Sequence, residues 1–185
     1  MDLRPQDIVL VLKLVATSPS WSFGRLGKEL SMSASHAFDS ARRAERLHLL
    51  RISTAPPSPP RARGVLLEPI RTNLREFLIH GVRYVFSVER GGVTRGVPTA
   101  EAASPLREYF PEPSVLQPVW PDPKGPVRGT AFSPLYKNVP QAARQDPKLY
   151  ELLALVDAIR EGRAREREIA IRELTARIDD HQSIR

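Results

Sequence analysis

The apolar positions near the start of the chain predict a helix that is buried on most of its sides. Every residue from Ile8 to Ala16 is apolar except Lys13. Pro5 and Asp7 suit a first helical turn, which predicts a helix over about 5–17. A helix that is apolar all round has to be covered all round. We therefore expect one side to pack on the helices that follow, and the other on the C-terminal part of the chain or on a second subunit.

The next apolar positions predict a helix-turn-helix. Leu26 and Leu30 lie four residues apart, which predicts a short helix from Gly24 to Leu30. After a two-residue turn, Ser33 suits the cap of a second helix, predicted over about 34–46. The helical repeat predicts which residues of this second helix pack against the rest of the domain. They are Ala37, Ala41, Ala44 and then Leu47 or His48.

The opposite face of the second helix is available for DNA. The recognition helix of a helix-turn-helix presents its N-terminal side chains to base edges in the major groove. On this face, Arg42 is the best candidate for contact with a phosphate or a guanine. The alternative is an ordinary solvated helix in a small helical domain. The candidate DNA-binding residues on and beside the two helices are Arg25, Ser33, Ala34, Ser35, Phe38, Asp39, Arg42 and Arg43.

A β-hairpin is predicted directly after the second helix. Residues 48–53 suit a strand, 54–64 a projecting loop and 65–67 a returning strand. The loop holds four prolines, which lower the entropy cost of ordering it. We expect its Arg61 and Arg63 to contact phosphates or a minor groove, although a loop with incidental arginines is an equally good interpretation of the loop alone. Two helices followed by a hairpin predict a winged helix.

The chain over about 3–69 resembles the winged-helix regulators of bacteria, especially the MarR type and related helix-turn-helix repressors. The resemblance rests on residues 30–33 (Leu-Ser-Met-Ser), on the Arg42-Arg43 pair and on Leu49-Leu50 leading into the wing. The chain differs from the family pattern in having His48 in place of a glycine and alanines in place of larger aliphatic residues on the packed face. The resemblance implies a transcriptional repressor.

Three further segments are predicted after the hairpin. An apolar stripe predicts a linking helix over 73–86. Residues 87–147 hold 11 of the 18 prolines, yet they are too rich in apolar side chains for a disordered linker. We expect them to form an ordered, irregular segment with few regular elements. A strong apolar stripe predicts a long helix over about 146–178, with Gly162 as the place where it would kink.

Two short strings in the proline-rich segment suit structural roles better than functional ones. The glycine-rich string over 91–96 could hold a phosphate, but it lacks the spacing of nucleotide-binding loops, and a plain glycine turn is the better interpretation. Trp120 and the prolines beside it could line an effector pocket or a partner site. We prefer the interpretation that they cover the core.

These patterns together predict a mainly α fold with a small β-hairpin wing. We divide it into a winged helix-turn-helix DNA-binding domain over 1–70 and a region over 71–185. The second region contains the linking helix, the proline-rich segment and the C-terminal helix. In regulators of the resembled type the terminal helices build the dimer, which suggests dimerisation or partner binding for this region.

The distribution of charge favours DNA as the partner. The chain carries 28 lysines and arginines against 21 acidic residues, a formal net charge of +7. Residues 1–90 hold 14 of these basic residues against 8 acidic ones, so six of the seven excess positive charges lie in the half of the chain that contains the predicted recognition helix. Basic side chains there would neutralise phosphates and release counterions. A high net charge alone would also suit an anionic membrane or an acidic partner.

The sequence contains no pattern that predicts catalysis. There is no cysteine, the four histidines are scattered without metal-ligand spacing, and no nucleophile elbow is present. We therefore expect no enzyme activity, no metal and no cofactor. The apolar stretch 8–16 is too short to cross a bilayer. We expect a cytoplasmic protein that does not enter a membrane.

Two functional hypotheses follow. The first is a sequence-specific regulator, most simply a homodimeric repressor, that binds double-stranded DNA with the helix starting at Ser33 and with an arginine-bearing wing. The second is an antitoxin-like or adaptor protein that binds a partner protein through residues 87–185. The operator, any effector and the dimer geometry stay open at this point.

Overall fold

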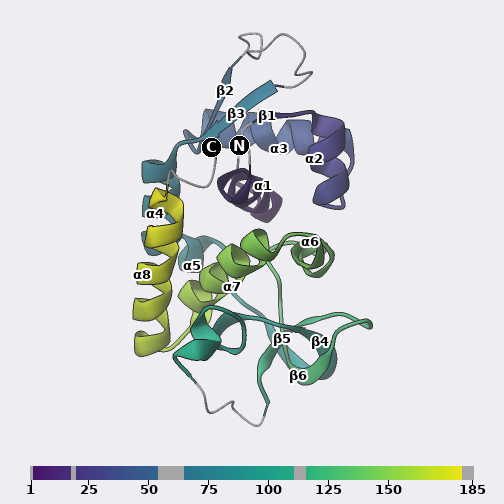
Figure 1. Cartoon of the computed structure of the whole chain (residues 1–185), viewed down its shortest axis with the longest axis vertical. Helices are drawn as coiled ribbons and strands as arrows, with labels where there is room; N and C mark the ends of the chain where they lie inside the picture. The colour runs from purple at the N-terminus through teal and green to yellow at the C-terminus, as the bar shows by residue number, and fades with distance from the viewer. Residues whose placement is uncertain (1, 18–19, 54–64, 111–115, 181–185) are drawn as a thin grey trace.

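The computed structural model describes residues 2–17, 20–53, 65–110 and 116–180 (Figure 1). Within these ranges the chain is a mixed α/β protein that is mainly helical, with eight α-helices and two small sheets. Apolar residues from both halves of the chain belong to one core. The helices α1 (Pro5–Ala16) and α7 (Pro147–Glu161) are buried along almost their whole lengths. They form the centre around which the other elements pack.

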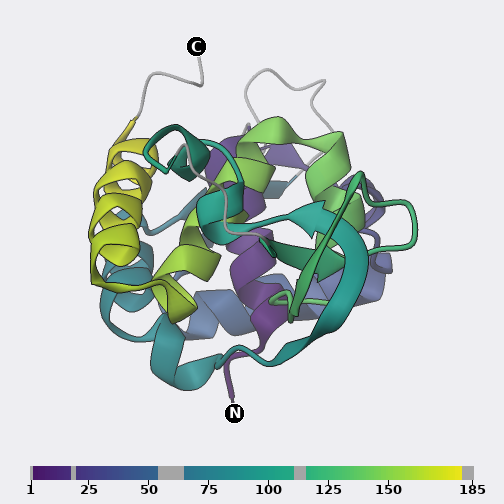
Figure 2. The same ribbon diagram turned by 90° about the horizontal axis from the view of Figure 1, so that it is seen from below.

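The first helix, α1, is buried on most of its sides, as predicted. Its residues from Ile8 to Val15 are at most 6% exposed. α3 (Ala34–Arg46) covers one side and α7 covers another, and α1 lies near the middle of the molecule when it is seen from below (Figure 2). The C-terminal part of the chain is thus one of the expected covers, and α1 needs no second subunit to bury it.

The two helices predicted after α1 have the expected bounds to within one residue. α2 spans Phe23–Glu29, and α3 begins after Ser33, whose hydroxyl accepts a hydrogen bond of 3.1 Å from the backbone N–H at the third helical position. Ser31 in the turn has a left-handed φ of 54°. The turn passes so close to Gly27 that a Cβ there would lie 2.7 Å from the carbonyl oxygen of Met32. Any larger residue at this glycine would push α2 away from the turn.

The end of α3 differs from the prediction. The three alanines expected to face the core are fully buried, but Leu47 and His48 are exposed. His48 has a left-handed φ of 56°, and Leu49 donates its N–H to the carbonyl oxygen of Ala44 at 2.9 Å. This pattern closes a helix C-terminus. Because the chain reverses here, Leu49 enters the core in place of the two preceding residues.

Three strands form a small antiparallel sheet beside these helices, in the order β1-β3-β2. β1 spans Ser20–Trp21, β2 spans Leu50–Ser53 and β3 spans Val65–Pro69. β2 and β3 pair as the predicted hairpin, and Leu67 of β3 is fully buried. β2 begins two residues later than predicted because the residues before it belong to the turn that ends α3.

The linking helix predicted over 73–86 is two helices. α4 spans Arg71–His80 and α5 spans Val82–Val85, with Gly81 between them. Glycine has a low helix propensity. At this position its missing side chain also leaves room for the ring of Phe77, which would lie 3.0 Å from a Cβ. The prediction of one continuous helix is therefore wrong at Gly81.

The proline-rich segment contains more regular structure than the sequence predicts. β4 (Arg90–Pro98), β5 (Pro118–Pro121) and β6 (Val127–Phe132) pair into a small closed sheet. The glycine turn expected over 91–96 is wrong, because these residues belong to β4. A Cβ on Gly129 would overlap the backbone carbonyl of Gln117, the residue directly before β5, which pairs with β6 in parallel. Glycine is therefore needed here for close strand approach and not for a turn.

Short helical elements complete this half of the chain: η1 (Ala100–Ala102), η2 (Leu106–Glu108) and α6 (Val139–Gln145). Trp120 of β5 is fully buried, which confirms the prediction that it belongs to the core, whereas Pro121 and Pro123 beside it are exposed. The indole Nε1 of Trp120 donates a hydrogen bond of 2.6 Å to Asp157 of α7. The small sheet is thus attached to the central helix through a buried polar contact.

The long helix predicted near the C-terminus is two helices, and the break between them lies at Gly162, where the sequence predicts a kink. α7 ends at Glu161 and α8 spans Ala164–Asp179. α8 folds back along α7, and Arg177 near its end donates to Glu151 near the start of α7 at 3.0 Å. The apolar stripes of both helices are therefore buried within one chain.

Candidate nucleic-acid interface

The α3 helix packs closely on its neighbours through small side chains. Ala37, Ala41 and Ala44 are fully buried, and Ser40 beside them is fully buried as well. Because none of these side chains is large, α3 lies close to α1. The other faces of α3 are left at the surface.

A stripe of four exposed residues lies directly opposite the buried alanines. Ser35, Asp39, Arg42 and Arg46 follow one another at spacings of four, three and four residues, which places them on one line along α3. We call these four residues the outer stripe. The Arg42 side chain is 53% exposed and donates to Glu45 at 2.8 Å. An exposed ion pair of this kind contributes about 0–1 kcal/mol, so the arginine can be released to another partner at low cost.

The N-terminal part of α3 presents further candidate residues beside the outer stripe. Ser33 and Ala34 are exposed at the start of the helix. Phe38 is 46% exposed, and its ring meets that of Phe23 in α2 edge to face, with 5.3 Å between the ring centres. The guanidinium of Arg42 lies 6.0 Å from the same ring. A large aromatic side chain is therefore held at the surface in a defined position.

Arg43, a predicted DNA contact, has a structural role instead. Its guanidinium donates to both carboxylate oxygens of Asp7, at 3.0 and 2.8 Å, and to the hydroxyl of Ser40 at 3.0 Å. Hydrogen bonding to Asp7 raises the pKa of Arg43 above its ordinary value. The Arg43 side chain is only 12% exposed and Asp7 is fully buried. Arg43 thus fastens α3 to α1, and we leave it out of the candidate interface.

Arg25 in α2 lies at the edge of the same surface. Its side chain is 65% exposed and donates to Glu29 at 3.0 Å. The guanidinium stacks over the ring of Trp21, 4.5 Å from the ring centre, and Trp21 itself is buried. The aromatic ring fixes the direction of Arg25 while leaving its donors accessible.

Three basic residues that the sequence-based selection omitted belong to this region. Lys28 in α2, Arg46 in α3 and Arg51 in β2 are exposed, and each lacks an ion pair among the residues that the structure describes. Arg46 could have been found from its spacing, because it follows Arg42 by four residues. The two predicted wing arginines, Arg61 and Arg63, lie outside the described residues.

A buried lysine joins the helices beneath this surface. Lys13 of α1 contacts Glu29 of α2 at 2.8 Å and Asp146 at 2.7 Å, and Asp146 caps the N-terminus of α7. The second half of the chain also reaches the turn before α3, where the amide of Asn138 donates to the carbonyl oxygen of Ser31. The candidate interface is therefore supported by elements from both halves of the chain.

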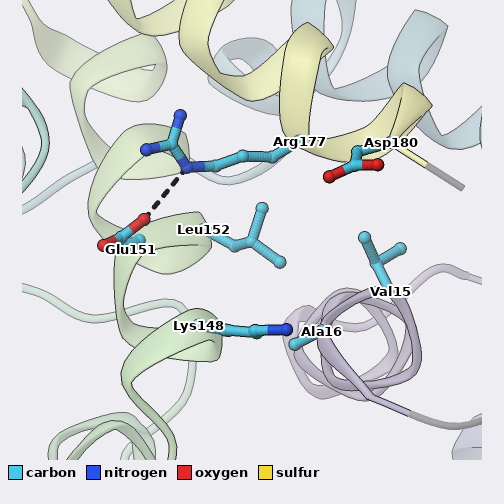
Figure 3. Close-up of a pocket in the computed structure, with 7 residues that line it drawn as sticks. All are labelled: Val15, Ala16, Lys148, Glu151, Leu152, Arg177 and Asp180. Carbon is cyan, nitrogen blue, oxygen red and sulfur yellow. Dashed lines mark hydrogen bonds and ion pairs between the residues drawn. The ribbon is translucent and has the colours of Figure 1, made fainter. Parts of the chain in front are cut away.

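A cavity of about 170 Å³ lies away from this surface, where the ends of α1 and α8 meet the start of α7 (Figure 3). It contains no residue of α2 or α3. Within the described ranges, no group of three or more histidine, cysteine, aspartate and glutamate residues could hold a metal ion. The lining combines apolar and charged side chains: Val15, Ala16, Lys148, Glu151, Leu152, Arg177 and Asp180.

Among the described residues, no helix has both the length and the apolar character needed to cross a membrane. Comparison with family models, curated proteins and solved structures gives no match. The surface formed by α2, α3 and β2 is therefore the candidate functional site.

Proposed function

We propose that this chain is a sequence-specific transcriptional regulator that binds double-stranded DNA with α3 in the major groove. The observation that carries the proposal is the outer stripe of α3, which is exposed, polar and backed by a rigid packed face. Direct readout of a DNA sequence requires side chains that reach the base edges from one face of a rigidly held helix.

The arrangement around α3 supports a winged-helix mode of binding. The β2–β3 hairpin follows α3 in the chain, as a wing does, and we propose that Arg61 and Arg63 in its loop contact the DNA backbone. Arg25, Lys28 and Arg51 lie on the elements flanking α3 and suit contact with phosphates. Such contacts release counterions, so we expect the affinity to fall steeply as salt is raised.

We further propose a homodimer that represses transcription by covering a promoter. Since α1 is covered within the chain, its apolar surface gives no support to a dimer, and the proposal relies on the family resemblance alone. A two-fold dimer requires an inverted repeat with half-sites about 10 base pairs apart, or a multiple of that. Residues 87–185 supply α7, which covers α1, so we assign them first to completing the fold.

The variant Arg42→Ala tests the orientation of α3. We expect it to weaken binding to a specific site by about 1–3 kcal/mol, because the contact of Arg42 with a base edge is lost. Fluorescence anisotropy with a labelled duplex measures the change. Arg172→Ala is the matched control, because Arg172 is an exposed arginine on α8 and its loss should leave the affinity almost unchanged. If Arg42→Ala binds with the affinity and salt dependence of the unchanged protein, the outer stripe is not the DNA-facing surface.

A further inference from the structure

Asp39 is the one acidic residue of the outer stripe. It lies between Ser35 and Arg42 on the face of α3 opposite the buried alanines, and its side chain is exposed. A carboxylate in this position is repelled by the phosphates that the neighbouring basic residues would attract. It therefore lowers affinity for DNA in general, except where a contact with a particular base compensates for the repulsion.

Among the residues that the structure describes, Asp39 forms no hydrogen bond or ion pair that would explain its position. The nearest candidate partner is Arg43, four residues along the helix, and the charge of Asp39 does favour that guanidinium. The hydrogen bonds of Arg43, however, go to Asp7 and Ser40. An acidic residue stabilises a helix N-terminus when it lies in the first turn. Asp39 lies after the first turn of α3, so it has no such role. Its carboxylate oxygens remain available at the surface.

The chemistry of a carboxylate selects among the bases in the major groove. An ionised aspartate can only accept hydrogen bonds. Guanine presents acceptors in the major groove and adenine presents an acceptor beside its amino group, whereas cytosine presents an amino donor alone. We infer that Asp39 is a specificity-determining residue that accepts a hydrogen bond from the amino group of a cytosine. This inference rests on the proposed DNA binding.

The spacing to Arg42 defines the site more closely. Three residues of α-helix rise about 4.5 Å, slightly more than the 3.4 Å between base pairs. With Arg42 donating to the O6 and N7 atoms of a guanine, the preferred site contains this guanine and the cytosine in two different G·C base pairs, on the same or opposite strands, within about two base pairs of each other. Phe38, fixed beside them by Phe23, suits contact with a thymine methyl group.

Selection from a random double-stranded DNA library tests this inference. The full-length chain and its Asp39→Ala and Asp39→Asn variants are each used to enrich bound duplexes at physiological salt, and the products are sequenced. We expect the unchanged protein to enrich a motif with one cytosine that Asp39→Ala no longer prefers. In Asp39→Asn the preference at that position should move to adenine, because an amide can both accept from and donate to adenine.

Affinity measurements on the same variants provide a second readout. For Asp39→Ala, binding to unrelated DNA should become tighter, and the ratio of specific to unrelated affinity should fall about tenfold or more. Glu168→Ala removes the same charge from an exposed position on α8 and should change neither the motif nor the ratio. Unchanged thermal melting confirms that the Asp39 variants fold, as expected for an exposed residue.

The outcomes distinguish this inference from the proposed function. If the unchanged protein and Asp39→Ala both enrich the same motif with the same preference at every position, the role of Asp39 is wrong while DNA binding stands. If the unchanged protein enriches no motif, the proposed sequence-specific function is wrong, and the role of Asp39 is wrong with it.

Discussion

Replacement of Asp7 by alanine is expected to lower the free energy of unfolding by about 3–5 kcal/mol and also to weaken DNA binding. Asp7 is fully buried and accepts two hydrogen bonds from Arg43 and one from the backbone N–H of Arg4. Removing one partner of a buried ion pair leaves the other without compensation, and losses of this size are typical. The free energy is measured by urea denaturation, and binding by anisotropy.

Two comparisons isolate the cause of this loss. Arg42→Ala, on the exposed side of the same helix, should stay within about 0.5 kcal/mol of the unchanged protein. The double variant Asp7→Asn/Arg43→Met removes both charges and should recover part of the stability, because no buried charge is left unpaired. If Asp7→Ala unfolds at the same urea concentration and with the same dependence on urea as the unchanged protein, the Asp7–Arg43 contact does not hold α3 to α1.

Replacement of Asp157 by alanine is expected to cost about 3–5 kcal/mol as well. Asp157 accepts hydrogen bonds from Thr99 at 2.8 Å, from Trp120 at 2.6 Å and from Arg160 at 2.7 Å. Burial raises the pKa of Asp157, and these three donors favour its charged form. In the variant, three buried donors lose their acceptor, and the guanidinium of Arg160 loses its counter-charge.

Thermal melting followed by circular dichroism measures this effect. For a chain of this length, 3–5 kcal/mol corresponds to a fall in Tm of roughly 6–20 °C. The control is Asp179→Ala, which breaks a partly exposed ion pair with Arg75 and should cost about 1 kcal/mol or less. A melting temperature for Asp157→Ala equal to that of the control would contradict the role of Asp157 in attaching the small sheet to α7.

The first half of the fold could be predicted because local signals agree there. The alanine spacing of α3, the Ser33 cap and the apolar run of α1 each depend on residues close in the sequence. The predicted bounds of α3 match the structure, and the hairpin strands differ only at their ends. The outer stripe follows from the same period, so most of the candidate interface could be selected from the sequence.

The second half could not be predicted because its structure depends on distant contacts. Glycines that predict turns by composition, such as Gly96 and Gly129, allow strands to approach closely in a sheet. Gly162 could be identified as a weak point in a helix, but the reversal after it depends on α8 packing along α7. Both features require knowledge of which segments meet in space.

The role of Arg43 was missed for a related reason. Arg42 and Arg43 are adjacent and have the same chemistry, yet one is exposed and the other is held by Asp7, 36 residues away. The helical period places Arg43 nearer the packed side but does not identify its partner. An isolated acidic residue in the buried helix α1 was the signal that could have suggested this pairing.

The measurement that tests the central claim most directly is a binding titration with the full-length chain. Labelled DNA from upstream of its own gene is compared with a scrambled duplex of the same composition, from low to physiological salt. We predict tight binding to the upstream DNA that keeps a strong preference over the scrambled duplex at physiological salt. Equal, weak and salt-sensitive binding to both duplexes would contradict a self-regulating, sequence-specific role for α3.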